Sequence, residues 1–301
     1  MTHPAVVAEV TTRLAAAGIG PARAEARWLV QHVVAEGSAA SPQPGWTDRL
    51  EALVRRRQAH EPLQLLLGSW PFRGVELLLE PGVFLPRPET EVVAGLAVEY
   101  AAAAGTGAVV AEPCTGSGAI AASLLAEVPG VTVHATDIDP RAVDLARRNL
   151  GRVDGANRFA VHHGDLLDPL PHGLRGHLDL LVANPPYLPA ADADHLDAEV
   201  AGHDPAAALF GGEVGHEVVD RLLVLAMTWL RPAGVVVLEL DTRLAAAALT
   251  TAAGVGFATA ELVRDLAGRQ RALVARVPAT AEAVGCTRDA GTVHHRAGAG
   301  S

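Results

Sequence analysis

Apolar side chains in the first sixty residues recur at helical spacing. They repeat every three or four positions through residues 5–36 and 47–60, which places them on one face of an α-helix. The segment between, residues 38–45, contains two prolines and a glycine and has the composition of a loop. The pattern predicts a small helical N-terminal domain over residues 1–62.

Residues 63–87 follow a different pattern. Two apolar runs, Leu65–Trp70 and Val75–Leu79, are separated by a short segment that contains glycine. Runs of this length around a turn favour paired strands. We therefore expect a hairpin-like bridge between the helical domain and the rest of the chain.

From residue 88 onward, short apolar runs typical of buried strands alternate with segments at helical spacing. The predicted strands are Ala108–Ala111, Val131–Thr136, Phe159–His163, Leu178–Ala183, Val235–Leu240 and Arg271–Val277, and the predicted helices are Gly118–Glu127, Pro140–Leu150 and Glu217–Leu230. This alternation indicates an α/β domain over residues 88–278, with an open, mostly parallel sheet covered by helices on both faces. Residues 279–301 are rich in small residues and are predicted to be disordered. Metal binding by His294 and His295 is an alternative there, but we expect no metal site.

Composition narrows the possible functions. The 301-residue chain is half hydrophobic and has only two cysteines, Cys114 and Cys286, too few for a disulfide framework. It shows neither an apolar stretch of membrane-spanning length nor a signal-peptide pattern, so we expect a cytoplasmic protein with no membrane attachment, acting as a monomer. The net charge of −10 argues against broad binding to DNA or RNA. Every basic residue is arginine, which excludes lysine-based catalysis.

A glycine-rich loop, Glu112–Gly118, stands between the first predicted sheet strand and its helix. Glycines let the backbone approach a ligand, and the helix N-terminus offers free N–H groups. Asp137 ends the next strand, where a carboxylate can accept ribose hydroxyls, and Asp165 follows the third, where it can accept the exocyclic amine of adenine. Ligands bind at the carboxyl ends of the strands in open α/β sheets, so these groups predict a nucleoside site.

Two cofactors are compatible with this loop. Residues Gly116–Ala121 match the G-x-G-x-x-A form of the dinucleotide fingerprint. Glu112, however, would repel a pyrophosphate and suits the ammonium of a methionine moiety. The balance favours S-adenosylmethionine.

The tetrapeptide Asn184-Pro185-Pro186-Tyr187 follows the buried run Leu178–Ala183. Its prolines restrict the backbone and hold the Asn184 amide at a fixed angle beside free carbonyls. Tyr187 adds a flat wall with a polar tip. Such an elbow can hold a planar group that bears an NH2, because the amide oxygen and a free carbonyl are both acceptors. The alternative is a plain strand stopped by a Pro-Pro turn.

Taken together, these segments resemble one family. The chain is similar, over about residues 61–277, to the peptide chain release factor N5-glutamine methyltransferases (the HemK family). The segments that carry the resemblance are Glu61–Gln64 with Leu67-Gly68, Phe84–Glu91, Thr115–Ala121, Asp137–Asp139, Asn184–Tyr187, Ala208–Gly212 and Asp265–Arg269. Pro86-Arg87-Pro88-Glu89-Thr90 discriminates most, because Asn-Pro-Pro-Tyr also occurs in adenine-N6 DNA methyltransferases.

The resemblance implies a class I methyltransferase, with a Rossmann-like sheet behind a helical substrate-docking domain, that methylates the glutamine of the Gly-Gly-Gln loop in class I release factors. It implies that the glycine loop holds the methionine part of the cofactor, that Asp137 holds the ribose, that Asp165 and Leu166 flank the adenine, and that Asn184 and the Pro185 carbonyl hold the target amide. The candidate cofactor-binding residues are Glu112, Cys114, Thr115, Gly116, Ser117, Gly118, Asp137, Asp165, Leu166 and Asn184. The candidate substrate-binding residues are Arg87, Glu89, Thr90, Asn184, Pro185, Pro186 and Tyr187, and the last four are also the candidate catalytic residues.

Three departures from the family pattern leave the substrate open. They lie at residues 112–114, 188–205 and 240–242, the last directly after the acid Glu239. A paralogue with another amide substrate, an adenine-N6 methyltransferase and a nucleotide-binding docking protein without activity are therefore the alternatives.

Some side chains also have two interpretations. Cys114 is either a packing residue or a reactive thiol, and Arg87 and Glu89 form either an interdomain salt bridge or a wall of the substrate channel. Residues 55–57, three consecutive arginines, form either a solvated helix face or a contact with RNA or an acidic partner.

Overall fold

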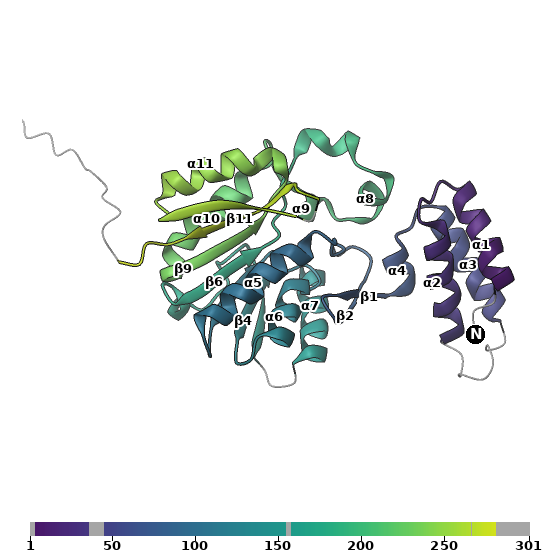
Figure 1. Cartoon of the computed structure of the whole chain (residues 1–301), viewed down its shortest axis with the longest axis horizontal. Coiled ribbons are helices and arrows are strands. Elements are labelled where there is room, and N and C mark those ends of the chain that lie inside the picture. Colours follow the sequence, from purple (N-terminus) through teal and green to yellow (C-terminus); the bar gives the residue numbers. More distant parts are fainter. Residues whose placement is uncertain (1–3, 36–44, 155–157, 266, 281–301) are drawn as a thin grey trace, which may run out of the picture.

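The computed structural model describes residues 4–35, 45–154, 158–265 and 267–280. A helical bundle at the N-terminus lies beside a larger α/β body, and a short helix and a hairpin connect them (Figure 1). Within the described residues, no helix is both long enough and apolar enough to cross a membrane. Residues 281–301 of the predicted tail (279–301), with its two histidines, lie outside the described residues, as does most of the predicted loop 38–45.

The N-terminal bundle consists of α1 (Pro4–Ala16), α2 (Ala22–Ala35) and α3 (Trp46–Gln58). Their apolar faces meet in a separate hydrophobic core, in which Leu14, Leu29 and Val54 are fully buried. The helical spacing in the sequence thus predicted the bundle, since each apolar face is buried against the other two helices.

The bridge begins with a helical turn, α4 (Leu63–Leu67), and continues as a hairpin of β1 (Ser69–Phe72) and β2 (Val75–Leu78). A hairpin is therefore present in this segment, but the apolar run at 65–70 is not a single strand. Its first half is helical and ends at Gly68, whose positive φ of 71° closes the turn.

The α/β body is built on a seven-stranded sheet of order β10-β11-β9-β6-β3-β4-β5. The strands are β3 (Val109–Pro113), β4 (Thr132–Asp137), β5 (Phe159–His163), β6 (Leu178–Ala183), β9 (Leu230–Glu239), β10 (Thr259–Arg264) and β11 (Gln270–Arg276). Five neighbouring strands (β9, β6, β3, β4 and β5) pair in parallel, whereas β11 runs antiparallel to both β9 and β10. The predicted α/β class with a mostly parallel sheet is confirmed.

Helices cover both faces of the sheet (Figure 1). One core lies under α5 (Thr90–Ala104), α6 (Ala119–Glu127) and α7 (Pro140–Val153), and the other under α10 (Glu217–Trp229) and α11 (Ala245–Val255). The sequence did not predict α11 or β10: α11 is Ala-rich and lacks a strong polar face, and β10 is an edge strand with no buried residue.

An insertion after β6 folds over the carboxyl edge of the sheet. It contains β7 (Leu188–Pro189), a 3-10 segment at Ala190–His195, α8 (Ala198–His203), α9 (Ala206–Leu209) and β8 (Phe210–Gly212), and β7 pairs with β8. Two further 3-10 segments lie at His172–Leu174 and Thr242–Leu244. Three arginines from outside the insertion form ion pairs with it: Arg57 with Glu199, Arg87 with Asp204, and Arg243 with Asp192. We call residues 188–212 the arch.

The three consecutive arginines of α3 all form ion pairs within the protein. Arg55 pairs with Glu51 and Arg56 with Glu61 at the surface, whereas Arg57 is 4% exposed and pairs with the buried Glu25 at 2.5 Å. Arg57 also bonds Glu199 of the arch at 2.6 Å, so it connects the bundle to the α/β body.

We expect Glu25→Gln to lower the free energy of unfolding by about 2–3 kcal/mol, because removing one partner leaves a buried guanidinium with only Glu199 to compensate it. Urea unfolding followed by circular dichroism measures this loss. The matched control is Glu80→Gln, which breaks an exposed pair with Arg148 and should cost less than about 1 kcal/mol. Equal losses in the two variants would contradict the importance of the buried pair.

Candidate active site

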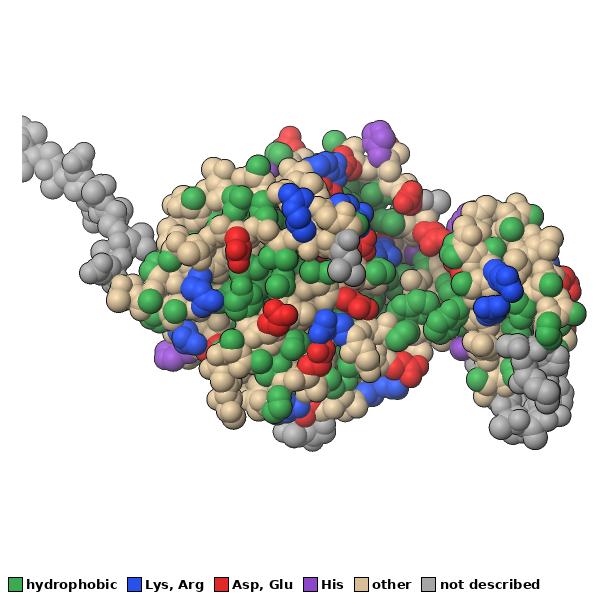
Figure 2. Space-filling view, viewed as in Figure 1, with side chains coloured by type: hydrophobic (Ala, Val, Ile, Leu, Met, Phe, Trp, Pro, Cys, Tyr) green, Lys and Arg blue, Asp and Glu red, His purple; other side chains and the backbone are tan. Residues whose placement is uncertain are grey.

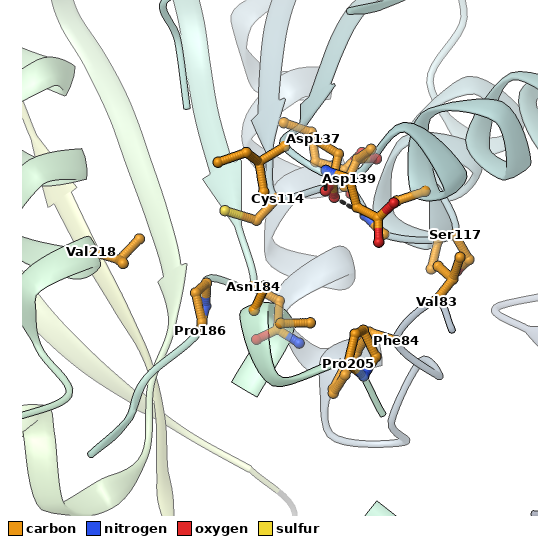
Figure 3. A pocket seen from close by; sticks show the side chains of 18 of the residues that line it. Val83, Phe84, Cys114, Ser117, Asp137, Asp139, Asn184, Pro186, Pro205 and Val218 are labelled. Carbon is orange, nitrogen blue, oxygen red and sulfur yellow. Dashed lines mark hydrogen bonds between the residues drawn. The ribbon is translucent and has the colours of Figure 1, made fainter. Parts of the chain in front are cut away.

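The loops that follow β3, β4, β5 and β6 meet at the carboxyl edge of the sheet and enclose a cavity of about 370 Å³. We call it the first cavity. Figure 3 shows Ser117, Asp137 and Asp139 on one side of it, Asn184 and Pro186 on another, and Cys114 between them. Parallel strands bring these loops together although they lie up to 70 residues apart in the sequence.

Hydrogen bonds to the buried carboxyl group of Glu112 hold the loop after β3 in place. Glu112 is 2% exposed, and its Oε2 accepts hydrogen bonds from the Thr115 hydroxyl at 2.9 Å and the Ala121 N–H at 3.0 Å. Burial raises the pKa of Glu112 to about 8. A buried carboxyl of this kind gains stability as an anion when a cation enters beside it.

Gly118 holds a different position from its neighbours in the loop. It is the N-terminal cap of α6, with a φ of 81°, and a Cβ there would lie 3.3 Å from the Cβ of Ala146. It does not line the first cavity, whereas Thr115, Gly116 and Ser117 do. Glycine is required at this position for close packing of α6 against α7.

Asp137 ends β4 and faces the first cavity. Its Oδ2 accepts from the Gly116 N–H at 2.8 Å and its Oδ1 accepts from the Asp139 N–H at 2.9 Å, so both oxygens are fixed. Burial raises its pKa. Beside it, the Ile138 side chain is 60% exposed and lines the cavity, and it offers an apolar surface for a flat ring.

Asp165 and Leu166 line the same cavity beyond Asp137. The Asp165 carboxylate pairs with Arg221 of α10 at 2.5 Å. Leu166 has a φ of 46°, and its carbonyl accepts from the buried Thr136 hydroxyl. Two separate elements therefore fix the far end of the cavity.

Cys114 is half-buried, and its side chain lines the first cavity. Its φ of 59° is unusual for a residue with a Cβ. Burial and, secondarily, the nearby Asp137 and Asp165 raise the pKa of the thiol, so it stays protonated. This environment favours a packing role over a reactive thiol.

Asn184 lies at the boundary between the first cavity and a second cavity of about 310 Å³. The second cavity is enclosed by the arch, and Arg87, Pro185 and Tyr187 line it together with Asn184. Pro186 lines the first cavity. The Asn184 Nδ2 donates to the Thr90 hydroxyl at 3.3 Å, and Thr90 itself is almost fully buried.

The two charged residues of the 86–90 segment have different surroundings. Arg87 forms an ion pair with Asp204 of the arch and lies over the Phe84 ring, so it is both a salt bridge and a wall of the second cavity. Glu89 lines neither cavity and pairs with Arg269 at 3.2 Å.

Several lining residues were not predicted from the sequence. In the first cavity they include Val83, Phe84, Ile138, Asp139, Val218 and Arg221, and in the second they include His195, Leu196, Asp197, Val200 and Asp241. Phe84, Ile138 and Asp139 lie within the segments that carried the resemblance and could have been found there. The remainder reach the site only through tertiary packing.

Comparison with known proteins identifies the fold and the family. A family model described as methyltransferase small domain matches residues 76–200. A crystal structure of a methyltransferase from Pyrococcus furiosus superposes with a TM-score of 0.51 at 19% identity, covering 76% of this chain and 98% of that one, which shows a common fold.

Two curated relatives are closer in sequence. The release factor glutamine methyltransferase of Streptomyces coelicolor is 42% identical over 243 residues, which cover 78% of this chain and 83% of that protein. The protein of the same name from Deinococcus radiodurans is 38% identical over 281 residues, covering 90% and 97%. These matches confirm the predicted methyltransferase activity and S-adenosylmethionine as the methyl donor. The chain belongs to the release factor glutamine methyltransferase family.

Proposed function

We propose that this protein transfers the methyl group of S-adenosylmethionine to the side-chain amide nitrogen (N5) of the glutamine in the Gly-Gly-Gln loop of a class I peptide chain release factor, in the cytoplasm. One observation carries the proposal: the Asn184 side chain borders both cavities. A methyl donor in the first cavity and an amide entering the second would meet at this residue.

The residues of the first cavity fit the cofactor. Glu112 and Asp137 are acceptors suited to an ammonium and to ribose hydroxyls, and Asp165 is suited to an adenine amine. Ile138 and Leu166 offer apolar surface for the adenine ring. The volume of about 370 Å³ is in the range of small-molecule sites.

The chain's own groups must orient a poor nucleophile, because the lone pair of an amide nitrogen is delocalised into its carbonyl. The bound cofactor supplies an electrophilic methyl group. The Asn184 Oδ1 and the Pro185 carbonyl each accept one N–H of the glutamine amide, which aims the nitrogen and stabilises the positive charge that develops on it. The proton can leave to solvent after transfer, so no strong base is needed before attack.

Charge favours a protein substrate over a nucleic acid. The chain carries a net charge of −10, and on the face shown in Figure 2 the arginines are interspersed with Asp and Glu. An adenine-N6 methyltransferase needs a basic surface for the phosphate backbone. The helical bundle, residues 1–62 in our division of the chain, would instead dock the release factor, because Arg57 connects it to the arch around the second cavity.

The direct test is methyl transfer from labelled S-adenosylmethionine to a purified class I release factor. We expect one methyl group on the Gly-Gly-Gln glutamine, located by mass spectrometry, and none on a variant with that glutamine changed to alanine. An adenine-containing DNA duplex and a binding assay with S-adenosylhomocysteine are run in parallel. Cofactor binding without transfer to the release factor would refute the proposed substrate, and transfer to DNA would favour the nucleic-acid alternative.

Asn184→Ala and Asp137→Ala should separate the two halves of the site. We expect Asn184→Ala to lower kcat about 100-fold, the effect of losing one acceptor in the transition state, with cofactor affinity nearly unchanged. Asp137→Ala should instead weaken cofactor binding about tenfold or more. Calorimetry with S-adenosylhomocysteine and steady-state kinetics distinguish the two effects. A wild-type kcat in Asn184→Ala would mean that the amide is not held there.

Glu112 makes cofactor affinity depend on pH. Its pKa is raised to about 8, so below this pH the carboxyl is protonated and must lose its proton to pair with the methionine ammonium. Affinity in the wild type should therefore fall as pH decreases from 8 to 6, by up to about tenfold per unit. The isosteric Glu112→Gln variant lacks this titration. Any titration of the ligand affects both proteins equally, so only the difference between their slopes reports on Glu112. Parallel slopes in calorimetry would contradict the pairing.

A further inference from the structure

The orientation of the Asn184 amide decides whether it can hold a substrate amide. Its Oδ1 accepts hydrogen bonds and its Nδ2 donates them, and the two ends differ only by a rotation of the group. An NH2 on the substrate needs the oxygen end. Something in the protein must therefore keep Nδ2 turned away from the second cavity.

Two buried residues lie behind Asn184. Thr90 is the first residue of α5 and is 3% exposed, and Glu239 is the last residue of β9 and is 1% exposed. Strand β9 pairs with β6 so that Leu238 lies beside Ala183, which brings Glu239 close to Asn184. Side chains from three elements far apart in the sequence therefore form one polar cluster under the elbow.

The hydrogen bonds of this cluster have a defined direction. The Thr90 hydroxyl lies within reach of Glu239 and lowers the pKa of its carboxyl. An ionised carboxylate can only accept, so in that state the hydroxyl proton points to Glu239. The Thr90 oxygen can then only accept from Asn184, and Nδ2 lies 3.3 Å from it. A chain of hydrogen bonds therefore runs from Asn184 through Thr90 to Glu239.

From this geometry we infer that Thr90 and Glu239 are positioning residues that keep the Asn184 oxygen facing the methyl-acceptor side. The inference rests on the proposed function for the identity of the acceptor. It concerns the protein's own hydrogen bonds and does not depend on which amide is methylated. Thr90, expected from the sequence to touch the substrate, acts on this interpretation through Asn184.

The surroundings of Glu239 allow the direction of these hydrogen bonds to reverse. Its Oε2 and the Nε of Arg271 have no hydrogen-bond partner among the described residues. Burial raises the pKa of Glu239 to about 7, against the opposing effects of Thr90, Arg271 and Arg87, while Glu89 adds to the rise. Tyr187 also lies near Glu239, Arg271 and Asp241, and Asp265 lies 3.6 Å from the Nε of Arg271.

Protonation gives Glu239 a donor, so the hydrogen bonds of the cluster can run in the opposite direction. A neutral Glu239 can donate to the Thr90 oxygen, and the Thr90 hydroxyl then donates to Asn184, which favours rotation of the amide with Nδ2 toward the second cavity. The productive orientation of Asn184 is therefore present above about pH 7 and is lost as pH falls below it. At saturating cofactor, kcat should then decline by up to about tenfold per pH unit.

Four variants test the inference. Thr90→Val removes the hydroxyl at constant shape, Thr90→Ser retains it, and Glu239→Gln removes the titration. The matched control is Thr251→Val, which breaks a 2.8 Å bond from a threonine hydroxyl to Asp220 on the other face of the sheet. We expect kcat to drop about 10- to 100-fold in Thr90→Val and Glu239→Gln, with the pH dependence near 7 lost, and to be restored in Thr90→Ser. Cofactor affinity should change less than about threefold, and Thr251→Val should behave as wild type.

A second measurement needs no substrate. The side-chain NH2 of Asn184, identified in ¹⁵N NMR spectra by its absence in Asn184→Ala, should shift with a midpoint near pH 7 in the wild type. It should not shift in Thr90→Val or Glu239→Gln. An absent shift in the wild type would overturn the inference even if the protein methylates nothing that is offered to it.

The two proposals fail differently. If the wild type does not methylate a release factor, the proposed substrate is wrong, and the NMR titration still decides the role of Thr90 and Glu239. If the wild type is active but Thr90→Val and Glu239→Gln keep its kcat and pH profile, the positioning role is wrong. A loss of kcat that Thr90→Ser does not restore, accompanied by an equal loss of cofactor affinity, would show only structural damage and would also overturn it.

Discussion

The arrangement of the site depends on one constraint, the parallel pairing of β4, β3, β6 and β9. The register places Pro113 beside Thr136, Ala111 beside Leu181, and Ala183 beside Leu238. Because parallel strands end at the same edge, the polar residues that terminate them come together without any local sequence signal that links them. Main-chain hydrogen bonds set their spacing, so the position of each side chain is determined before any ligand contact is made. The loops and the arch then close around this edge.

Gathering acids at a buried edge has an electrostatic consequence. Burial raises the pKa values of Glu112, Asp137 and Glu239, so each is less stable as an anion than it would be in water. None of the three pairs with an arginine side chain at hydrogen-bonding distance among the described residues, whereas Asp165 does so with Arg221. A cation or a hydrogen-bond donor that enters the edge relieves this cost. The site thus gives up some folding stability in exchange for affinity toward ligands that supply positive charge or N–H and O–H groups.

The sequence predicted the parts of this structure that depend on neighbouring residues. Strand ends, the glycine loop and the Asn-Pro-Pro-Tyr elbow all appear as short patterns, and the structure places Glu112, Thr115, Gly116, Ser117, Asp137 and Asn184 around one cavity. It did not predict the pairing of Arg221 with Asp165 or the contact of Glu239 with Thr90, because these join residues 56 and 149 positions apart with no pattern between them. The arch was also missed, since its helices are short and few of its described residues are buried. Gly118, which the loop fingerprint predicts to bind the cofactor, instead packs α6 against α7 and does not line the first cavity.

The two cavities differ in how they are built, and this difference bears on the choice of substrate. The first is bordered by strand ends and buried acids, and of the three departures from the family pattern it contains Glu112 and Cys114 from 112–114 and, from 188–205, only Pro205. Residues 188–205 and 240–242 contribute His195, Asp197, Val200 and Asp241 to the second cavity. The arch that carries most of them is held by ion pairs from Arg57, Arg87 and Arg243, with few buried apolar residues of its own. Of these pairs, the exposed one between Arg243 and Asp192 can be exchanged at small cost to the fold, whereas Arg57 and Asp204 are buried and cost more to lose. The proposed methyl-donor half is therefore constrained by the core, whereas the proposed acceptor half depends more on the ion pairs of the arch.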